Sequence, residues 1–258
     1  MKKNNGITLL ELLLSIVVSS LLMIGIGGLY VSFMKSNMKM NKLLTLRRQF
    51  AYANQLLERD IRMAGFNLPG NGIIVNSGVN NMFLLKNEEG LQTRLSQGAD
   101  IGDNYILVAN GYPGDVFIDD WVCLYDSTSD KMEYLRIINE PELNSGSYIL
   151  SFGSEVLQKT WDISNTDVYF AKAVRYSVDG TEPDVAFVRS TPQRDFKISK
   201  DIKEFVIIPL DGDRMDLTEF MPGASDLIRR VGIKLIKPIP EHNNSISSSI
   251  EVSIRNSL

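Results

Sequence analysis

The sequence predicts an α+β fold in which one long N-terminal helix packs on an antiparallel β-sheet head. Three observations support this. Residues 7–34 form an apolar run, residues 43–64 carry apolar side chains at helical spacing, and after Gly65 short β-like runs alternate with turn residues. Because one helix is followed only by strands, the sheet is expected to cover the apolar stripe of the helix.

The apolar run is long enough to cross a membrane. It spans 28 residues, from Ile7 to Met34, and its one charged residue is Glu11. About 20 apolar residues cross the hydrocarbon core as a helix. A cleaved secretory signal would have a shorter apolar region followed by small residues, which residues 34–38 do not provide. We therefore expect a membrane helix, with a plain single-pass anchor as the alternative.

Glu11 makes a plain anchor a poor explanation. A carboxylate in a membrane helix costs up to about 3 kcal/mol on insertion scales, so it normally has a function. If the six residues before Ile7 are removed, its ammonium group and the carboxylate of Glu11 could each be neutralised by the opposite group on a neighbouring helix, because paired charges cost much less than single ones in a low dielectric. Small residues, Ser15 with Ser19 and Gly28 with Ser32, would let such helices approach closely.

The helix is expected to continue to about Ala64. Glu58 and Arg62 are four residues apart in the favourable order, and Gly65 is a natural C-terminal stop. The expected organisation is a leader at 1–6, an apolar half of the helix at 7–34, an amphipathic half at 35–65 and a β-rich head at 66–258. The stripe consists of Leu43, Leu46, Phe50, Ala53, Leu57, Ile61 and Ala64.

The head is expected to contain at least nine strands. The pair 121–125 and 132–138 should form a hairpin, and Asp179-Gly180 should open the connection between two further strands. The nine ranges are 105–109, 121–125, 132–138, 148–152, 168–178, 185–189, 205–209, 231–236 and 250–255.

Composition disfavours catalysis and nucleic-acid binding. The net charge of −4 lacks the broad basic footprint of a nucleic-acid binder. One histidine, His242, and one cysteine, Cys123, leave little material for a zinc site or a catalytic triad, and Cys123 is expected to be a buried small apolar residue. Asp211 and Asp213, with Asp216 and Glu219, could hold calcium, although an acidic turn is the commoner explanation. The pairs Asp119-Asp120 and Asp126 with Asp130 are weaker candidates. We expect that the protein binds no cofactor and no metal and that it is not an enzyme.

The N-terminus resembles the type IV prepilin signature, in which a short basic leader ends in Gly and a Glu follows at the fifth mature position. Here the leader is Met-Lys-Lys-Asn-Asn-Gly and the next residues are Ile7-Thr8-Leu9-Leu10-Glu11. The resemblance implies peptidase cleavage between Gly6 and Ile7, N-methylation of Ile7, and an assembly role for Glu11. The family usually has Phe at the first mature position, where this chain has Ile7.

Further segments are similar to PilW-type minor pilins, and the build is similar to J-type pseudopilins of type II secretion. The segments are 56–66, 174–176, 187–189, 202–212, 231–235 and 252–256. The resemblance implies a pilin-like fold, and a structural minor pilin that primes or caps a type IV pilus. The alternatives are a J-type pseudopilin and, in another class, a pilus-tip adhesin or DNA-binding pilin. A membrane-anchored periplasmic enzyme is disfavoured.

The implied partners are a prepilin peptidase, other minor pilins, the major pilin, an inner-membrane assembly platform and, before assembly, membrane lipid. The implied location is the bacterial inner membrane, single-pass, with the N-terminus cytoplasmic and the head outside, and then the filament. Counting basic residues instead places the N-terminus outside, because five basic residues follow the run within residues 35–48. We follow the prepilin motif, since its peptidase acts at the cytoplasmic side.

Overall fold

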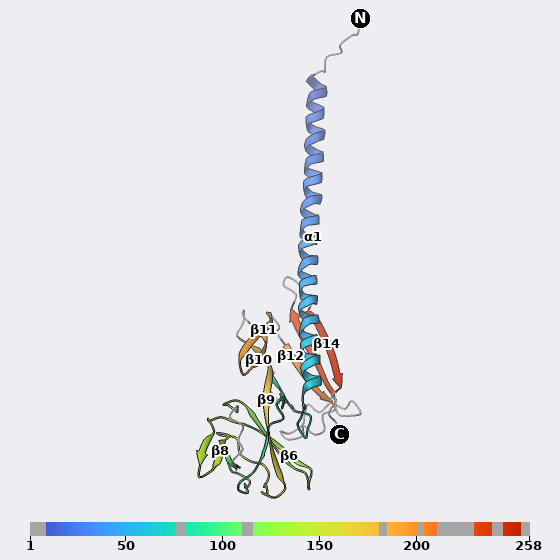
Figure 1. Cartoon of the computed structure of the whole chain (residues 1–258). Coiled ribbons are helices and arrows are strands. Elements are labelled where there is room, and N and C mark those ends of the chain that lie inside the picture. Colours follow the sequence, from blue (N-terminus) through green and yellow to red (C-terminus); the bar gives the residue numbers. More distant parts are fainter. Residues whose placement is uncertain are drawn as a thin grey trace. The chain divides into compact units, whose positions relative to one another are not determined.

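One long helix precedes a head made of antiparallel strands (Figure 1). This computed structural model describes residues 9–75, 81–109, 116–180, 185–200, 204–210, 230–238 and 245–253. Contacts divide the chain into two compact units, residues 1–49 and residues 50–258. In the first unit, α1 (Leu9–Met63) is helical from Leu9 onward, and its large apolar side chains are exposed. The prediction of a long N-terminal helix on an antiparallel sheet is confirmed.

In the second unit, the last turns of α1 bury the predicted apolar stripe from Phe50 onward, whereas its first two members, Leu43 and Leu46, are exposed and half-buried. Phe50, Ala53, Leu57 and Ile61 are at most 5% exposed, and Ala64 follows them just beyond the helix. The spacing of three and four residues places them on one face. Burying a Leu, Ile or Phe side chain is worth about 1.5–3 kcal/mol, so this face anchors the helix firmly to the head.

The helix ends where its backbone meets strand β2. Gly65 has a φ of +75°, and its N–H donates to the carbonyl of Leu85 at 2.8 Å. A Cβ on Gly65 would clash with the backbone carbonyl of Gly70 and would lie 2.9 Å from that of Asn71. Only glycine accepts both the left-handed backbone and this close approach. The predicted stop at Gly65 is confirmed in this geometry.

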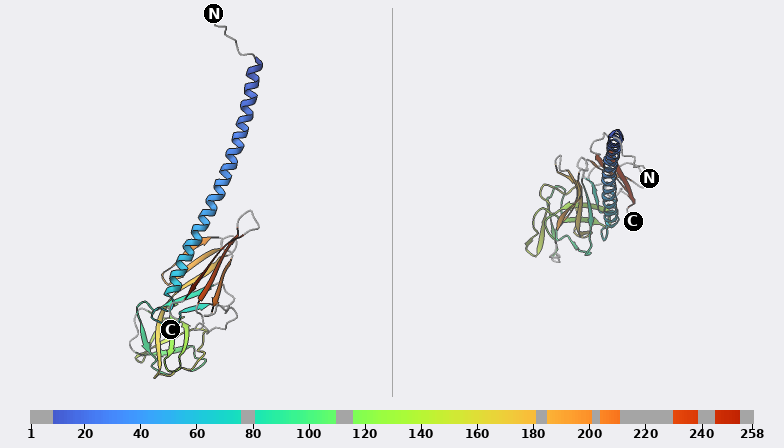
Figure 2. Two further views of the ribbon diagram at one scale, coloured as in Figure 1. Left: turned by 90° about the vertical axis from the view of Figure 1, so that its right-hand side faces the viewer. Right: turned by 90° about the horizontal axis from the view of Figure 1, so that it is seen from above.

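The described strands form three sheets (Figure 2). The largest has the order β1-β2-β9-β10-β11, with β3, β5 and β6 joined through β9; the second is β12-β13-β14 and the third β4-β8-β7. The bounds are β1 Ile73–Val75, β2 Asn81–Lys86, β3 Gln92–Arg94, β4 Tyr105–Val108, β5 Trp121–Asp126, β6 Lys131–Arg136, β7 Glu142–Asn144, β8 Ser147–Ser151, β9 Thr166–Asp179, β10 Ala186–Thr191, β11 Arg194–Lys200, β12 Glu204–Leu210, β13 Arg230–Pro238 and β14 Ser245–Ser253.

Each of the nine predicted ranges overlaps a strand, and the predicted hairpin is β5–β6, in which Tyr125 pairs with Met132. The connection opened by Asp179 joins β9 to β10, where Asp179 pairs with Ala186. Five strands were not predicted, namely β1, β2, β3, β7 and β11. Three of them have only three residues, too few for a period-two pattern to be recognised.

Two sheets share one core with the helix. The stripe of α1 packs with Met82 of β2, Tyr176 of β9, Phe187 of β10, and Phe205, Leu235 and Val252 of β12, β13 and β14. The rings of Tyr176 and Phe187 stack with centroids 5.7 Å apart, and Phe187 meets Phe205 at 4.9 Å. The helix is therefore covered by residues from both the β9-centred sheet and the C-terminal sheet.

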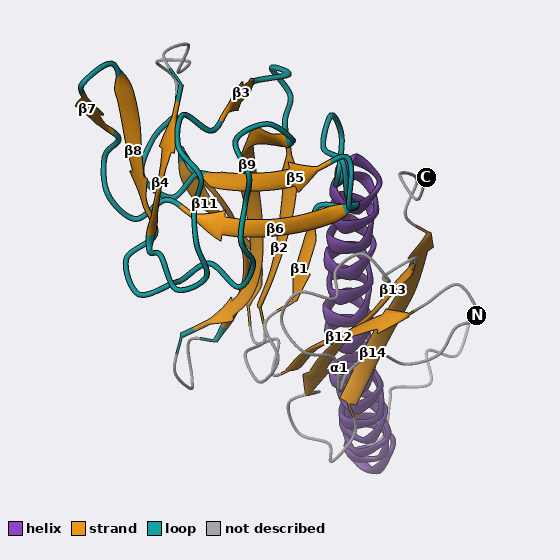
Figure 3. Cartoon of the chain, turned by 90° about the horizontal axis from the view of Figure 1, so that it is seen from below, coloured by secondary structure: helices purple, strands orange, loops and turns teal. Residues whose placement is uncertain are grey.

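A second core lies inside a barrel-like arrangement of strands, formed by residues 87–165, which we call the lobe, together with the first part of β9. Figure 3 shows these strands. The ring of strands runs β9-β5-β6-β8-β4-β3 and returns to β9. One backbone bond, from Ile138 to Ser151 at 2.9 Å, joins β6 to β8, and the Leu95–Val108 bridge joins β3 to β4. Alternate residues point inward and are buried, as in a small filled barrel: Ile106, Val108, Val122, Leu124, Leu135, Ile137, Leu150, Phe152, Val168 and Phe170.

Candidate processing and assembly site

The apolar half of α1 is an exposed helix of membrane-spanning length. Its most apolar window has a mean hydropathy of 2.5, and none of that window is buried. The hydroxyls of Ser15 and Ser20 donate to the carbonyls of Leu12 and Val17 at 2.9 and 2.8 Å, so these polar groups are satisfied within the helix. An apolar helix with satisfied hydroxyls suits a lipid or helix-bundle environment.

Glu11 lies in the first described turn of α1, and its side chain is exposed. Gly6 and Ile7, the predicted cleavage and methylation residues, lie outside the described residues. Further along, a Cβ on Gly25, Gly27 or Gly28 would meet nothing within 4 Å. These glycines leave space beside the backbone, which close helix–helix packing in a bundle could fill.

A buried ion pair fastens the C-terminal part of α1 to the sheet. Asp60 is 7% exposed, and its Oδ2 accepts from Arg189 Nε at 2.7 Å and from the Tyr176 hydroxyl at 2.8 Å. Arg59 donates to the other carboxylate oxygen at 3.0 Å. Burial opposes ionisation of Asp60, but these hydrogen bonds and the charge of Arg189 outweigh it, so the pKa of Asp60 is lowered. Burial and the nearby carboxylate raise the pKa of Tyr176.

Sequence reasoning missed this cluster. The partners of Asp60 lie 116 and 129 residues away in sequence, so no local spacing indicates them. The predicted pair Glu58–Arg62, four residues apart, is present at 2.8 Å but exposed. The one available signal was Asp60 itself, a carboxylate between the buried Leu57 and Ile61 of the stripe.

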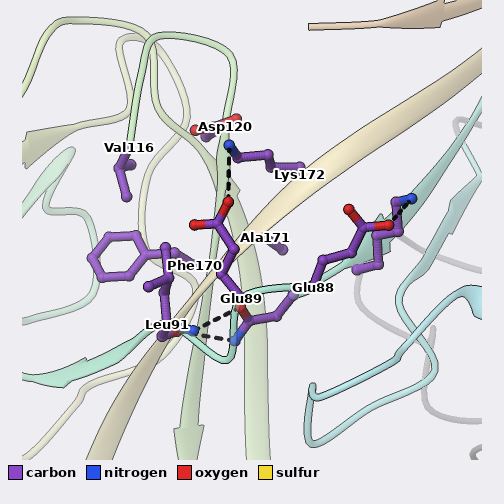
Figure 4. Close-up of a pocket in the computed structure, with 10 residues that line it drawn as sticks. Glu88, Glu89, Leu91, Val116, Asp120, Phe170, Ala171 and Lys172 are labelled. Atoms are coloured by element: carbon purple, nitrogen blue, oxygen red, sulfur yellow. Dashed lines mark hydrogen bonds and ion pairs between the residues drawn. The ribbon is translucent and has the colours of Figure 1, made fainter. Parts of the chain in front are cut away.

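A small hollow lies where β2 passes β9 (Figure 4). Lys172 and Glu89 form an ion pair across it at 3.9 Å. Asp120 is 3% exposed and accepts from the backbone N–H of Phe117 at 2.9 Å; burial raises its pKa despite that bond. The Asn87 amide holds the adjacent turn by bonding both backbone groups of Leu91. These polar side chains therefore stabilise the loops around the hollow. No nucleophile next to a general base is found among the residues that line it.

The other acidic pairs also support turns. Asp119 pairs with Arg136 at 2.6 Å. Asp126 accepts from the side chains of Thr128 and Ser129, which lowers its pKa, and Asp130 accepts from the Tyr125 hydroxyl. In the described part of the chain no group of three His, Cys, Asp or Glu side chains could hold a metal ion. The suggested calcium ligands Asp211, Asp213, Asp216 and Glu219, and also His242, lie outside the described residues.

Cys123 lies in β5, is fully buried and forms no disulfide. Its Sγ lies 3.9 Å from the carbonyl of Leu124. The expected burial of Cys123 is confirmed.

Comparison with known families finds the prokaryotic N-terminal methylation motif at residues 1–27. No curated protein and no solved structure matches the chain. The motif, together with the long apolar helix, supports a type IV pilin-like or pseudopilin-like protein that prepilin peptidase processes. It fits a protein anchored in the inner membrane and points to a structural role.

Proposed function

We propose that this prepilin-type chain is a structural minor pilin of PilW type, which primes or caps a type IV pilus. The observation that carries the proposal is the methylation motif at residues 1–27, which runs directly into the exposed apolar half of α1. The peptidase cuts between Gly6 and Ile7, the new amino group of Ile7 is methylated, and residues 7–34 first anchor the chain in the membrane and then enter the filament core. Residues 35–65 connect this segment to the head, residues 66–258.

Assembly uses the charge in the apolar segment. Glu11 lies four residues after Ile7, so staggered neighbours bring the carboxylate of one chain to the N-terminal amine of another. Each charge alone is costly in a low-dielectric bundle, and pairing removes most of that cost. Pairing therefore selects the axial stagger at which both groups are neutralised.

The N-terminus starts on the cytoplasmic side and the head lies outside. The partners are the peptidase, other minor pilins, the major pilin and the assembly platform. In its described part, the head is held by three apolar clusters and by the buried ion pair of Asp60 with Arg189. These features suit a rigid filament subunit.

The test is expression in a pilus-forming host that contains prepilin peptidase. We expect the mature N-terminus to be Ile7 and the chain to be recovered in sheared filaments. Glu11→Ala should be cut normally but be at least about tenfold depleted from filaments, because the neighbour's ammonium loses a partner worth more than about 1.4 kcal/mol. Gly6→Val is the contrasting variant: it should remain uncut and membrane-bound.

Equal recovery of Glu11→Ala and the wild type in filaments would remove the assembly role of Glu11. An intact leader, or a cut elsewhere, would contradict the prepilin proposal as a whole. Loss of protein secretion with normal pili after deletion of the gene would instead assign the chain to type II secretion.

A further inference from the structure

Charge is distributed unevenly along this chain. The lobe, residues 87–165, contains 14 acidic and 4 basic side chains, a formal charge of −10. The remaining residues contain 17 acidic and 23 basic side chains, a formal charge of +6. The exposed carboxylates of the lobe include Glu88, Glu89, Asp100, Asp119, Asp130, Glu140, Glu142, Glu155 and Asp162. A field of one sign over a whole lobe attracts a cationic partner.

Exposed apolar side chains lie next to three of these carboxylates, Asp100, Asp119 and Glu155, in loops at one end of the lobe. Ile101, Ile118, Ile138 and Val156 are 66%, 44%, 37% and 39% exposed. We call the surface formed by residues 100–102, 117–119, 138–142 and 153–156 the end surface. Apolar groups set among charges are typical of a protein-binding surface rather than of one that only faces water.

Backbone and side-chain bonds hold the loops of the end surface together. The Gly102 N–H donates to the Leu157 carbonyl at 3.0 Å, and the Asp119 N–H donates to the Ile137 carbonyl at 2.9 Å. Arg136 links two loops, because its backbone N–H donates to Glu155 at 3.1 Å and its guanidinium pairs with Asp119. A Cβ on Gly153 would lie 3.1 Å from Ile138, which places these two loops in contact. The end surface is thus a connected feature of the folded lobe.

The matching chemistry occurs in the same chain, at residues 35–48 of α1, which we call the basic segment. It has five basic residues and no acidic one. Lys35, Lys39 and Lys42 follow at spacings of four and three and so share one face of the helix. Like charges at these spacings destabilise a helix, and an anionic partner would remove that cost. The exposed apolar side chains here are Met38, Met40, Leu43 and Leu44, at 61%, 57%, 36% and 42%.

We propose that the end surface of the lobe in one copy of this chain binds the basic segment of a second copy. The two surfaces are opposite in charge, and each carries exposed apolar groups. A lipid surface with anionic headgroups would attract the basic segment but repel the lobe, so it cannot account for the lobe. The inference rests on the proposed filament role, and it requires that two copies of this chain lie next to each other in the assembly.

The first test measures self-association of the full chain in non-ionic detergent by sedimentation velocity. We expect association at about 0.05 M salt and dissociation at about 0.5 M, because the screening length shortens. The lobe reversal Asp100→Lys, Glu140→Lys, Glu142→Lys should weaken association by about tenfold or more, and so should the segment reversal Lys35→Glu, Lys39→Glu, Lys42→Glu. An equimolar mixture of the two reversed chains restores one complementary pair of surfaces and should associate again.

Asp195→Lys on β11 is the matched control, because Asp195 is exposed but lies outside the lobe. It should leave association within about twofold of the wild type, since it alters no group of either surface. Circular dichroism checks that every variant is folded.

The second test is an inter-copy disulfide between a chain carrying Glu140→Cys and a chain carrying Lys42→Cys. The native Cys123 is fully buried, so it adds little background. A cross-linked heterodimer should form at low salt, and it should be lost when Asp100→Lys and Glu142→Lys are added to the chain that carries Glu140→Cys. The proposal would be overturned if association were unaffected by salt and by both reversals. It would also be overturned if the mixture of the two reversed chains failed to associate.

The outcomes also separate this surface from the filament role. A chain that is cut after Gly6 and enters filaments, yet shows neither charge-dependent association nor the cross-link, loses the docking surface and keeps the proposed function. A chain that associates through these surfaces but never enters filaments loses the proposed function and keeps the docking surface.

Discussion

Removing the charge of Asp60 should destabilise the head much more than removing an exposed charge of the same helix. Asp60→Asn keeps the shape of the side chain but takes away the negative charge that Arg189 contacts at 2.7 Å. Arg189 is only 13% exposed, so its guanidinium would remain largely desolvated without a counter-charge. Breaking a buried pair costs about 3–5 kcal/mol, and we expect about 3 kcal/mol because the Asn carbonyl still accepts one bond.

The assay is thermal unfolding of the full chain in detergent, followed by near-ultraviolet circular dichroism. For a domain of this size 1 kcal/mol shifts Tm by about 2–4 °C, so Asp60→Asn should lower Tm by roughly 6–12 °C. Glu58→Gln is the matched control on the same helix. Its pair with Arg62 is exposed at both ends, so its removal should cost under about 1 kcal/mol.

The effect should depend on pH in one direction. The folded pKa of Asp60 lies below its ordinary value, so its contribution is fully present above the unfolded pKa and is lost as pH falls through the folded one. The Tm difference between the wild type and Asp60→Asn should therefore be largest at neutral pH and shrink below about pH 4. The double replacement Asp60→Leu with Arg189→Met should recover much of the loss, because no buried charge is left unpaired.

Two results would refute this reasoning. One is an Asp60→Asn variant as stable as Glu58→Gln at neutral pH. The other is a Tm difference that stays constant from pH 7 into the acid range.

Two further predictions concern the helix and its end. Deleting residues 1–34 should release a soluble, folded head, because the first buried apolar residue of the stripe is Phe50 and residues 9–34 are exposed; an insoluble product that binds an apolar dye would contradict this. Gly65→Ala should lower the free energy of unfolding by roughly 2 kcal/mol or more in urea titrations, because both its φ of +75° and the Asn71 backbone oppose a Cβ. Gly90→Ala, at a φ of +67° in open space, should cost only about 1 kcal/mol; equal losses in the two variants would show that the contact with Asn71 is unimportant.

Local patterns in the sequence were sufficient for the helix, its stripe and most strands. Phe50, Ala53, Leu57 and Ile61 recur at three and four residues, and this spacing alone defines the buried face. The apolar run with Glu11 close behind Gly6 predicted the prepilin character, which the motif at residues 1–27 supports. The missed strand β11 alternates polar residues with Phe196 and Ile198, a period-two signal that could have predicted it.

The closure of the lobe could not be predicted in this way. The strands that complete its ring, β3, β4 and β8, are short, and the joins depend on single contacts such as Ile138 to Ser151. The sequence predicted strands at β4 and β8, whereas β3 consists of three polar residues and was not predicted. The order of the strands depends on pairings between distant segments, and the spacing of residues in the sequence does not indicate those pairings.

The sequence by itself determined a long two-part helix, a β-rich head, and an uneven charge with an acidic stretch at 87–165 and a basic one at 35–48. Only the tertiary structure decided that Asp60 meets Tyr176 and Arg189, and that carboxylates and exposed apolar groups gather at one end of a barrel. The physical reason is the distance along the chain over which each interaction acts. Periodicity and capping act within a few residues of the chain, whereas the ion pair joins Asp60 to Arg189 and the barrel closes by pairing residues as distant as Gln92 and Tyr169.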